Sequence, residues 1–347
     1  MSGPIFRAYF QALPCKVEYR VTSVRVAVVG VGNIGRRHLR IIRELTTTPP
    51  FAVSRRLAAR QELAVEGFGT AASIREAVDA GVTLCVIATE TAQHTADACA
   101  ALEAGCDVLV EKPLGIDVAD ALSAGEAALK SNHSIHVGCV LRFADSLARF
   151  RRLLPRIGSV HSVRVACQTY LPDWRTGRPL SEYYSSREDG GVLRDLIHDV
   201  DYTGWIFGWP LAIQARLRNV GRLGIVAEEA AELLWDIPDG PSVNMSLDFL
   251  TRPPRRLMTA FGEGGTLEWD GIRGITTLSM FNQEPEVQTV HETIDQLLSL
   301  QNRAFIETGS RFDPRLATGA DALKALAICD TARCASEKGC VEKVQYA

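Results

Sequence analysis

Long apolar runs and an excess of one charge are both missing from this sequence of 347 residues. No stretch stays apolar for the roughly 18–20 residues that a membrane-spanning helix needs, so we expect no membrane partner. Lys and Arg number 38 and Asp and Glu number 41, which leaves a formal charge of -3. A chain balanced in this way has no polycationic surface, and we therefore expect no nucleic-acid partner.

Patterns of metal ligands are also missing. The nine cysteines include no C-x-x-C pair, and the seven histidines include no H-x-x-x-H pair. These spacings predict no metal site and reduced thiols, which are typical of a cytoplasmic protein. Residues 1–22 lack the apolar core of a signal peptide, so we expect an N-terminal arm there and assign it no function.

The length favours two domains, and a change of hydrophobic period places their boundary near residue 145. Before it, β-branched runs alternate with helical patterns. This alternation predicts right-handed βαβ units and a doubly wound parallel sheet, a Rossmann domain, over residues 23–144. The expected strands are 24–29, 51–53, 82–88, 107–110 and 135–140. The expected helices are 34–45, 55–66, 73–80, 93–104 and 117–130.

The second half of the chain changes to a period of two. Three runs alternate apolar with polar residues, which predicts half-buried strands with one wet or partner-covered face. The runs are 163–168, 213–218 and 243–249. Asp239-Gly240 and Glu263-Gly264-Gly265 predict turns. We expect helices over 292–307 and 315–337 to complete a domain of residues 145–347 that binds substrate and carries subunit contacts.

A G-x-G-x-x-G motif follows the first expected strand and opens an amphipathic helix, which is the context that a dinucleotide site requires. Gly30 permits the tight turn, Gly32 lets the backbone approach a pyrophosphate, and Gly35 lets the helix pack close to the strand. The free N–H groups at the helix start, around Asn33 and Ile34, would face the phosphates. The alternative is a glycine-rich turn without a ligand.

The end of the second strand favours NADP over NAD. An NAD site has a carboxylate about 20 residues after the motif. Nineteen residues after Gly35, the sequence instead reads Ser54-Arg55-Arg56. One charge-assisted hydrogen bond of about 1.5–3 kcal/mol from such an arginine to a 2′-phosphate favours NADP roughly ten- to hundredfold. If both arginines are solvated residues of a helix start, NAD remains the cofactor.

Two further segments end expected strands, where open α/β sheets bind their ligands. One runs from Thr89 through Thr91 to His94, and the other is Glu111-Lys112-Pro113. We expect Thr89, Thr91 and Glu111 to contact the cofactor. For His94 two roles stay open, because it could face the cofactor or cap its own helix.

With these segments, the glycine motif and a later Gly-Gly…Asp195…His198 segment, the chain resembles the family of glucose-fructose oxidoreductase and inositol dehydrogenase. The resemblance extends from Val24 to about Val341. It implies a Rossmann domain followed by an α/β domain built on an open, mostly antiparallel sheet. It also implies that Lys112 and Glu111 contact the nicotinamide ribose region and that the bond from Lys112 to its following proline is cis.

Lys112, His198 and Asp195 are the candidate catalytic residues. An ammonium group at Lys112 can hydrogen-bond a substrate oxygen and stabilise developing alkoxide charge. Asp195 and His198 are three residues apart, so on one helix they would share a face, and an imidazole beside a carboxylate exchanges a proton near neutral pH. The family commonly spaces this pair by four, and Asp199 and Asp201 are the alternatives to Asp195.

A long segment from residue 170 to 187 precedes this pair, and long loops in compact domains are often functional. Aromatic faces with guanidinium groups suit a sugar ring or an anion. The candidate substrate residues are Arg142, Tyr170, Trp174, Arg175 and Tyr184. The resemblance here is to family members found with bacterial surface-glycan sugar biosynthesis. The alternative is a segment used for subunit packing.

The sequence thus predicts an NAD(P)-dependent oxidoreductase that acts on a carbinol or ketone carbon of a sugar, activated sugar or polyol. A cofactor-sensing protein without catalysis is one alternative. A lyase or epimerase that oxidises and re-reduces its substrate with bound cofactor is another. Because exposed apolar sheet faces are unfavourable, we expect a homodimer or homotetramer formed through the second sheet.

Overall fold

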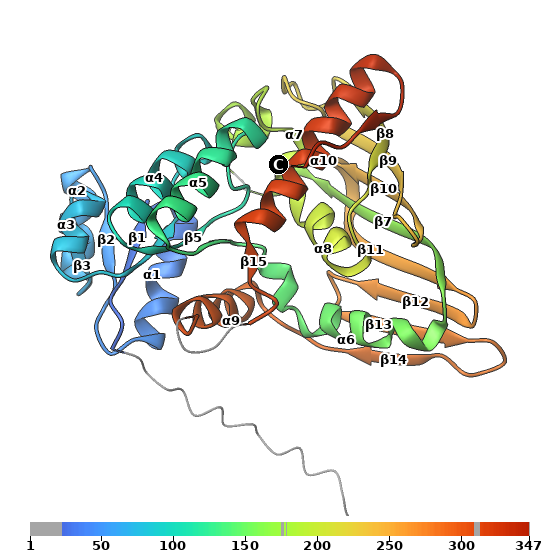
Figure 1. The fold of residues 1–347 in the computed structure, drawn as a ribbon, viewed down its shortest axis with the longest axis horizontal. Coiled ribbons are helices and arrows are strands. Elements are labelled where there is room, and N and C mark those ends of the chain that lie inside the picture. The colour runs from blue at the N-terminus through green and yellow to red at the C-terminus, as the bar shows by residue number, and fades with distance from the viewer. Residues whose placement is uncertain (1–22, 175–176, 178, 309–312, 347) are drawn as a thin grey trace, which may run out of the picture.

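The computed structural model of the chain describes residues 23–174, 177, 179–308 and 313–346. Two sheets stand side by side, and helices from both halves of the chain fill the space between them (Figure 1). The expected N-terminal arm and Arg175 lie outside the described residues. Among those described, no helix is long and apolar enough to cross a membrane.

The first sheet has seven strands in the order β15-β6-β5-β4-β1-β2-β3. Its strands are β1 (Val26–Val29), β2 (Phe51–Val53), β3 (Gly69–Ala71), β4 (Leu84–Ile87), β5 (Asp107–Val110), β6 (Ile135–Val137) and β15 (Ala317–Thr318). Its helices are α1 (Asn33–Leu45), α2 (Leu57–Val65), α3 (Ile74–Asp79), α4 (Thr91–Glu103) and α5 (Val118–Ser131). The parallel, doubly wound sheet is confirmed, and the chain reverses its direction of winding beside β1, which opens a ligand crevice at that point.

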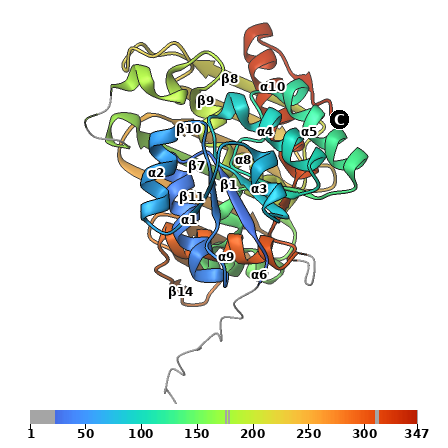
Figure 2. The ribbon, with the colours of Figure 1, turned by 90° about the vertical axis from the view of Figure 1, so that its left-hand side faces the viewer.

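Two features of the first sheet were not expected. Strand β3 is too short to show a period in the sequence. Strand β15 comes from the second half of the chain and pairs antiparallel with β6, while helix α9 (Ile294–Ile306) packs on α1. Residues 145–347 are therefore not confined to the second sheet, because the chain crosses back to complete the first. Figure 2 shows α9 beside α1 from the side.

The second sheet has nine strands in the order β14-β13-β12-β11-β7-β10-β9-β8-β16. They are β7 (Val160–Tyr170), β8 (Ala212–Arg218), β9 (Ala230–Asp236), β10 (Ser242–Asp248), β11 (Leu250–Gly262), β12 (Gly265–Asp270), β13 (Ile275–Met280), β14 (Glu286–Thr289) and β16 (Glu342–Lys343). The mostly antiparallel sheet is confirmed, and only β7 and β10 pair in parallel among the described strands of this second sheet. Both expected turns join strands, β9 to β10 and β11 to β12.

Helices α6 (Asp145–Leu153), α8 (Ile197–Phe207) and α10 (Gly319–Lys338) cover the inner face of this sheet (Figure 1). A short helix α7 (Gly191–Asp195) precedes α8, and 3₁₀ turns connect other elements: η1 (Val140–Phe143), η2 (Leu154–Ile157), η3 (Leu171–Asp173), η4 (Leu180–Glu182) and η5 (Tyr184–Ser186). α10 begins four residues later than expected, because the residues before it form β15. Thr318 and Asp321 form a capping box there, a motif that satisfies two free N–H groups.

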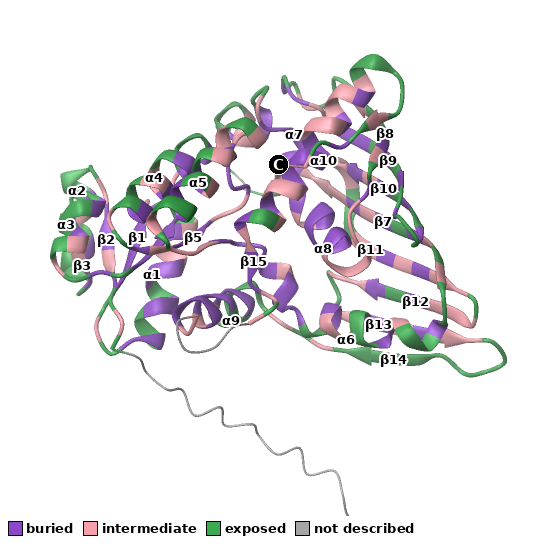
Figure 3. Cartoon of the chain, viewed as in Figure 1, coloured by how far each residue is buried: buried purple, intermediate pink, exposed green. Residues whose placement is uncertain are grey.

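The outer face of the second sheet is more polar than the expectation of an apolar face assumes. Along β10, Val243, Met245 and Leu247 point inward and are fully buried, while Ser242 and Asn244 are exposed. On the neighbouring strand β9, Glu232 presents a carboxylate instead of an apolar side chain, and this carboxylate accepts a hydrogen bond from the Ser246 hydroxyl. Figure 3 shows this mixture of exposed and half-exposed strand residues.

Candidate active site

The glycine motif has the geometry that a dinucleotide-binding loop needs. Gly30 has a φ of 91°, and a Cβ there would lie 2.6 Å from the Ala88 carbonyl oxygen. A Cβ at Gly35 would lie 1.9 Å from the Gly30 carbonyl oxygen, so α1 packs directly on the loop. At Gly32 a Cβ would meet nothing within 4 Å. The first and last glycines are thus required by packing, while the middle one leaves open space for a ligand.

The start of α1 is free to bind an anion. Gly32 is the N-cap residue, it offers no side-chain cap, and the first turn, which begins at Asn33 and Ile34, contains no acidic residue. Unpaired N–H groups and the positive end of the helix dipole therefore face the open space at Gly32. The loop fits a pyrophosphate, and the residues that would hold it are Gly32, Asn33 and Ile34.

A cavity of about 640 Å³ continues from this loop between the carboxyl ends of β1, β2 and β4. Its lining includes Gly30, Ser54, Arg55, Arg75 and Thr89. The Arg60 guanidinium donates to the Ser54 carbonyl at 2.7 Å and to the Arg55 carbonyl at 3.1 Å, which fixes the loop after β2.

Two arginines near this cavity differ from the expectation. Arg56 stands at the N-cap of α2, the position of a helix start. Arg75 lines the cavity although the sequence analysis did not single it out. The sequence analysis missed Arg75 because it did not expect strand β3, which precedes Arg75 at the start of α3.

The segment after β4 is fixed by its own side chains. The Thr89 hydroxyl donates to Asp97 at 2.9 Å, and Thr91 is buried at the start of α4. His94 is also buried, with Nδ1 at 2.7 Å from the Pro113 carbonyl oxygen and Nε2 at 3.1 Å from that of Thr89. The ring therefore ties the loop after β4 to the loop after β5.

Glu111 and Lys112 follow β5, and the peptide bond from Lys112 to Pro113 is cis, as the resemblance implied. Glu111 lies 2.9 Å from His38 Nε2 and also accepts the backbone N–H of Lys112 at 3.3 Å. Burial on its own raises the pKa of Glu111. The hydrogen bond from His38 and the positive charges of His38 and Lys112 outweigh burial and lower it.

The structure brings Lys112 and Asp195 together across the two domains. Lys112 Nζ donates to the Asp195 backbone carbonyl at 2.8 Å and lies 3.8 Å from the Asp195 carboxylate. That carboxylate also accepts the hydroxyl of Ser185, a residue that sequence analysis missed because it lies in a loop without periodicity. About a fifth of the Lys112 side chain, 22%, remains exposed toward solvent.

The expected helix carrying both Asp195 and His198 is broken. α7 ends at Asp195 and α8 begins at Ile197, and Leu196 between them has non-helical angles of φ -92° and ψ 23°. The two side chains therefore do not share a face of one helix. The three-residue spacing of Asp195 and His198 in the sequence does not indicate such a break.

His198 is neutral rather than poised near neutral pH. Burial lowers its pKa well below 6.5, and the nearby charges of Lys112 and Arg256 lower it further. Its Nδ1 is buried and has no hydrogen-bond partner among the described residues. This direction is opposite to the expected titration near neutral pH and favours the neutral imidazole.

Asp199 and Asp201, the two alternatives to Asp195, are paired with other side chains. Asp199 is fully buried, accepts the Tyr202 hydroxyl and pairs with Arg256 of β11 at 3.2 Å. Asp201 is buried in a two-bond pair with Arg142, at 2.9 Å and 2.6 Å. Only Asp195 of the three contacts Lys112 within hydrogen-bond distance in the described residues.

The described candidates for substrate contact lie in three places. Arg142 is 1% exposed and bonds Asp201 and Asp321, so it is placed in the core rather than on a binding surface. Tyr184 lies beside Ser185, and its hydroxyl donates to the Asp189 carbonyl. Tyr170 instead stacks under the Arg252 guanidinium, and Trp174 packs edge-on against Phe249. Those two aromatic side chains form a separate cluster at the end of β7.

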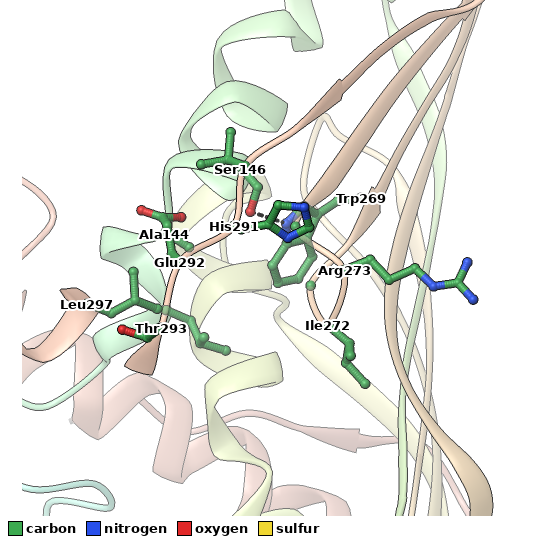
Figure 4. Close-up of a pocket in the computed structure, with 13 residues that line it drawn as sticks. Ala144, Ser146, Trp269, Ile272, Arg273, His291, Glu292, Thr293 and Leu297 are labelled. Carbon is green, nitrogen blue, oxygen red and sulfur yellow. Dashed lines mark hydrogen bonds between the residues drawn. The ribbon is translucent and has the colours of Figure 1, made fainter. Parts of the chain in front are cut away.

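A second cavity, of about 160 Å³, lies where α6, the β12–β13 turn and the segment before α9 meet. Figure 4 shows His291 and Glu292 at its edge and the Arg273 side chain pointing away. Two of its polar side chains are already paired, since the Trp269 indole donates to Ser146 and Glu292 accepts the Asp145 backbone N–H. It offers no chemistry comparable with that around Lys112.

Two family models match this chain. Residues 24–139 match the "Oxidoreductase family, NAD-binding Rossmann fold", and residues 152–268 match the "GFO/IDH/MocA C-terminal domain". The rhizopine catabolism protein MocA of Rhizobium meliloti is 27% identical over 320 residues, which are 90% of this chain and 95% of MocA.

Two further comparisons cover less sequence or show fold alone. Myo-inositol dehydrogenase Hyg17 of Streptomyces leeuwenhoekii is 30% identical over 188 residues, 53% of this chain and 55% of that protein. The structure of levoglucosan dehydrogenase with NADH has a TM-score of 0.80 at 17% identity, with 93% of this chain and 100% of that chain covered. The chain belongs to the GFO/IDH/MocA family of NAD-binding oxidoreductases.

Proposed function

We propose that this protein transfers a hydride between a nicotinamide cofactor and a carbinol or ketone carbon of a sugar, activated sugar or polyol. The observation that carries the proposal is the position of Lys112. Its ammonium group stands at the carboxyl end of β5, bonded to Asp195 at 2.8 Å, on the same sheet edge as the open glycine loop. The names of Hyg17, a myo-inositol dehydrogenase, and of levoglucosan dehydrogenase support a polyol or sugar substrate.

The proposed mechanism divides the proton chemistry between two residues. Lys112 donates a hydrogen bond to the substrate oxygen and stabilises negative charge that develops there. His198, neutral because its pKa is lowered, accepts the hydroxyl proton during oxidation and returns it during reduction. Asp195 holds Lys112 in place. The cofactor, when bound, supplies the two-electron acceptor or donor.

We propose NADP as the preferred cofactor. Ser54 and Arg55, which follow β2, line the cavity with Arg75, and the carboxylates of its described lining, Asp97 and Glu103, come from α4. The test is a titration of stripped protein with NADPH and NADH, followed by energy transfer from tryptophan. NADPH should bind at least about tenfold more tightly. Arg55→Ala should remove the preference, while Arg40→Ala, an exposed change on α1, should keep it. Tighter NADH would contradict the proposal.

We propose further that the substrate is an activated sugar of bacterial surface-glycan biosynthesis. The support is the Tyr170 ring at the start of the segment 170–187, which lies under the guanidinium of Arg252 from β11 at 3.8 Å. Turnover of myo-inositol, levoglucosan and UDP-N-acetylglucosamine is measured with each cofactor by nicotinamide absorbance and by product chromatography. Faster turnover of the nucleotide sugar supports this form, and faster turnover of a free polyol contradicts it.

The same panel separates the alternatives. Tight cofactor binding without turnover of any sugar would indicate a cofactor-sensing protein. Product formation without a net change in absorbance would indicate a lyase or epimerase. Net reduction of cofactor with oxidised product is the result that the proposal expects.

We further propose a cytoplasmic homodimer or homotetramer formed through the second sheet. The described cysteines, from Cys85 to Cys340, are unpaired thiols, which suits a reducing compartment. Leu234 of β9 and Val287 of β14 are exposed apolar residues on that sheet. Light scattering at micromolar concentration should give at least twice the monomer mass, and a monomeric mass contradicts the assembly.

A further inference from the structure

We propose that His38 and Asn302 act as a positioning pair for Lys112, through the carboxylate of Glu111. This inference rests on the proposed function, because it concerns how the same lysine is held. Neither residue was singled out from the sequence as a site residue. His38 lies on α1, one turn after Gly35, and Asn302 lies on α9, more than 260 positions later in the chain.

The contacts form a continuous buried path. Asn302 donates its amide N–H to the Leu298 carbonyl at 2.9 Å, which turns its Oδ1 toward His38 Nδ1 at 3.0 Å. The other ring nitrogen, Nε2, faces Glu111 Oε1 at 2.9 Å. His38 and Asn302 are both fully buried. With an oxygen acceptor on each side, a ring that carries hydrogen on both nitrogens satisfies both.

Glu111 transmits this position to Lys112. One carboxylate oxygen takes the bond from His38, and the other accepts the backbone N–H of Lys112 at 3.3 Å. On its remaining side the carboxylate packs against Gly138, where a Cβ would approach it to 3.3 Å. The Glu111 side chain is therefore confined from three directions. Because it accepts the backbone N–H of Lys112, it also fixes the backbone of that lysine.

The path also joins the two ends of the site. α1 carries the open glycine loop at its start and His38 near its middle, so the helix that faces the cofactor also holds the carboxylate beside Lys112. α9 belongs to the second half of the chain and anchors the path from outside the Rossmann segment. A displacement of about 1 Å at a reacting group can cost about 10²-fold in rate, which is why such confinement matters.

The test compares His38→Asn with a matched control, His136→Asn. His136 is a buried histidine of the neighbouring strand β6 that contacts the same helix α9 through Phe305, at 6.2 Å between ring centroids, and has no contact with Glu111. With a substrate turned over in the panel above, His38→Asn should lower kcat about 10- to 100-fold. KM and the cofactor Kd should stay within about threefold of the wild type. His136→Asn should alter the unfolding midpoint and leave kcat unchanged.

Two additional measurements keep the inference testable without turnover. Acetic anhydride labelling, read by mass spectrometry, should modify Lys112 faster in His38→Asn and in Asn302→Leu, with exposed Lys130 as the internal reference. Asn302→Asp keeps an oxygen for the ring but loses the amide donor to the Leu298 carbonyl, so Lys112 should be modified more slowly in it than in Asn302→Leu.

The outcomes separate the two proposals. Wild-type kcat and an unchanged Lys112 labelling rate in a folded His38→Asn protein overturn the positioning pair and leave the proposed function standing. Absence of cofactor binding or of turnover by the wild type overturns the proposed function, while the labelling comparison still decides whether His38 and Asn302 hold Lys112.

Discussion

The two walls of the candidate site are built by different means. The cofactor wall consists of backbone: a glycine loop, strand ends and a helix start, with Gly30 and Gly35 required by packing. The opposite wall consists of side chains from a broken helix and a loop, namely Asp195, His198 and Ser185. Backbone walls are specified by short motifs, whereas side-chain walls depend on tertiary contacts. The predictions below test this difference.

The largest effect is expected at Lys112, where the walls meet. Lys112→Ala should lower kcat by about 10²–10⁴-fold, because the group that bonds the substrate oxygen is removed. The cofactor Kd should change less than about tenfold, since the glycine loop is untouched. Steady-state kinetics with a panel substrate and energy-transfer binding measure the two quantities. A variant that keeps near-wild-type kcat would remove Lys112 from the chemistry.

The second prediction concerns the buried ion pair behind the side-chain wall. Arg142→Met leaves the Asp201 carboxylate without its partner in a fully buried position and should cost about 3–5 kcal/mol of unfolding free energy. Arg252→Met removes a pair with Asp173 whose side chains are 58% and 54% exposed, and should leave the unfolding curve nearly unchanged. Urea titrations of both variants provide the comparison. Equal losses would mean that Arg142 is more accessible than its contacts indicate.

The third prediction separates packing from binding within the glycine motif. Gly35→Ala places a methyl group 1.9 Å from the Gly30 carbonyl oxygen, so it should lower the unfolding midpoint and the yield of folded protein. Gly32→Ala meets no protein atom and should fold normally, but its cofactor Kd should rise about tenfold or more where the pyrophosphate approaches. If Gly32→Ala binds both nicotinamide cofactors as the wild type does, the pyrophosphate lies elsewhere.

These comparisons show what the sequence could predict. The parallel sheet, the glycine loop and the position of Lys112 follow from periods and spacings, because strand ends of a parallel sheet gather at one edge. The break at Leu196 does not follow, since residues 195–198 suit a continuous helix locally and tertiary packing decides. Arg142 illustrates the same limit: its charge suggested a substrate contact, but Asp201, 59 positions later, takes it into the core.

The last prediction uses the lowered pKa of His198. In the unfolded chain this histidine has an ordinary pKa of about 6.5, and in the folded protein burial and the charges of Lys112 and Arg256 lower it. Below pH 6.5 the unfolded state therefore takes up a proton that the native state refuses, and stability falls as pH falls, by at most about 1.4 kcal/mol per pH unit from this group. Above pH 6.5, His198 contributes no pH dependence to the free energy of unfolding.

His198→Gln should flatten this slope, because glutamine does not titrate. Since burial also lowers the pKa of His136, the His198→Gln variant keeps the part of the slope that comes from His136, and the difference between wild type and variant isolates His198. Urea unfolding between pH 5 and pH 8 measures it. An identical slope in both proteins would show that His198 gains a proton in the native state, and the neutral imidazole proposed as proton acceptor would then have to be abandoned.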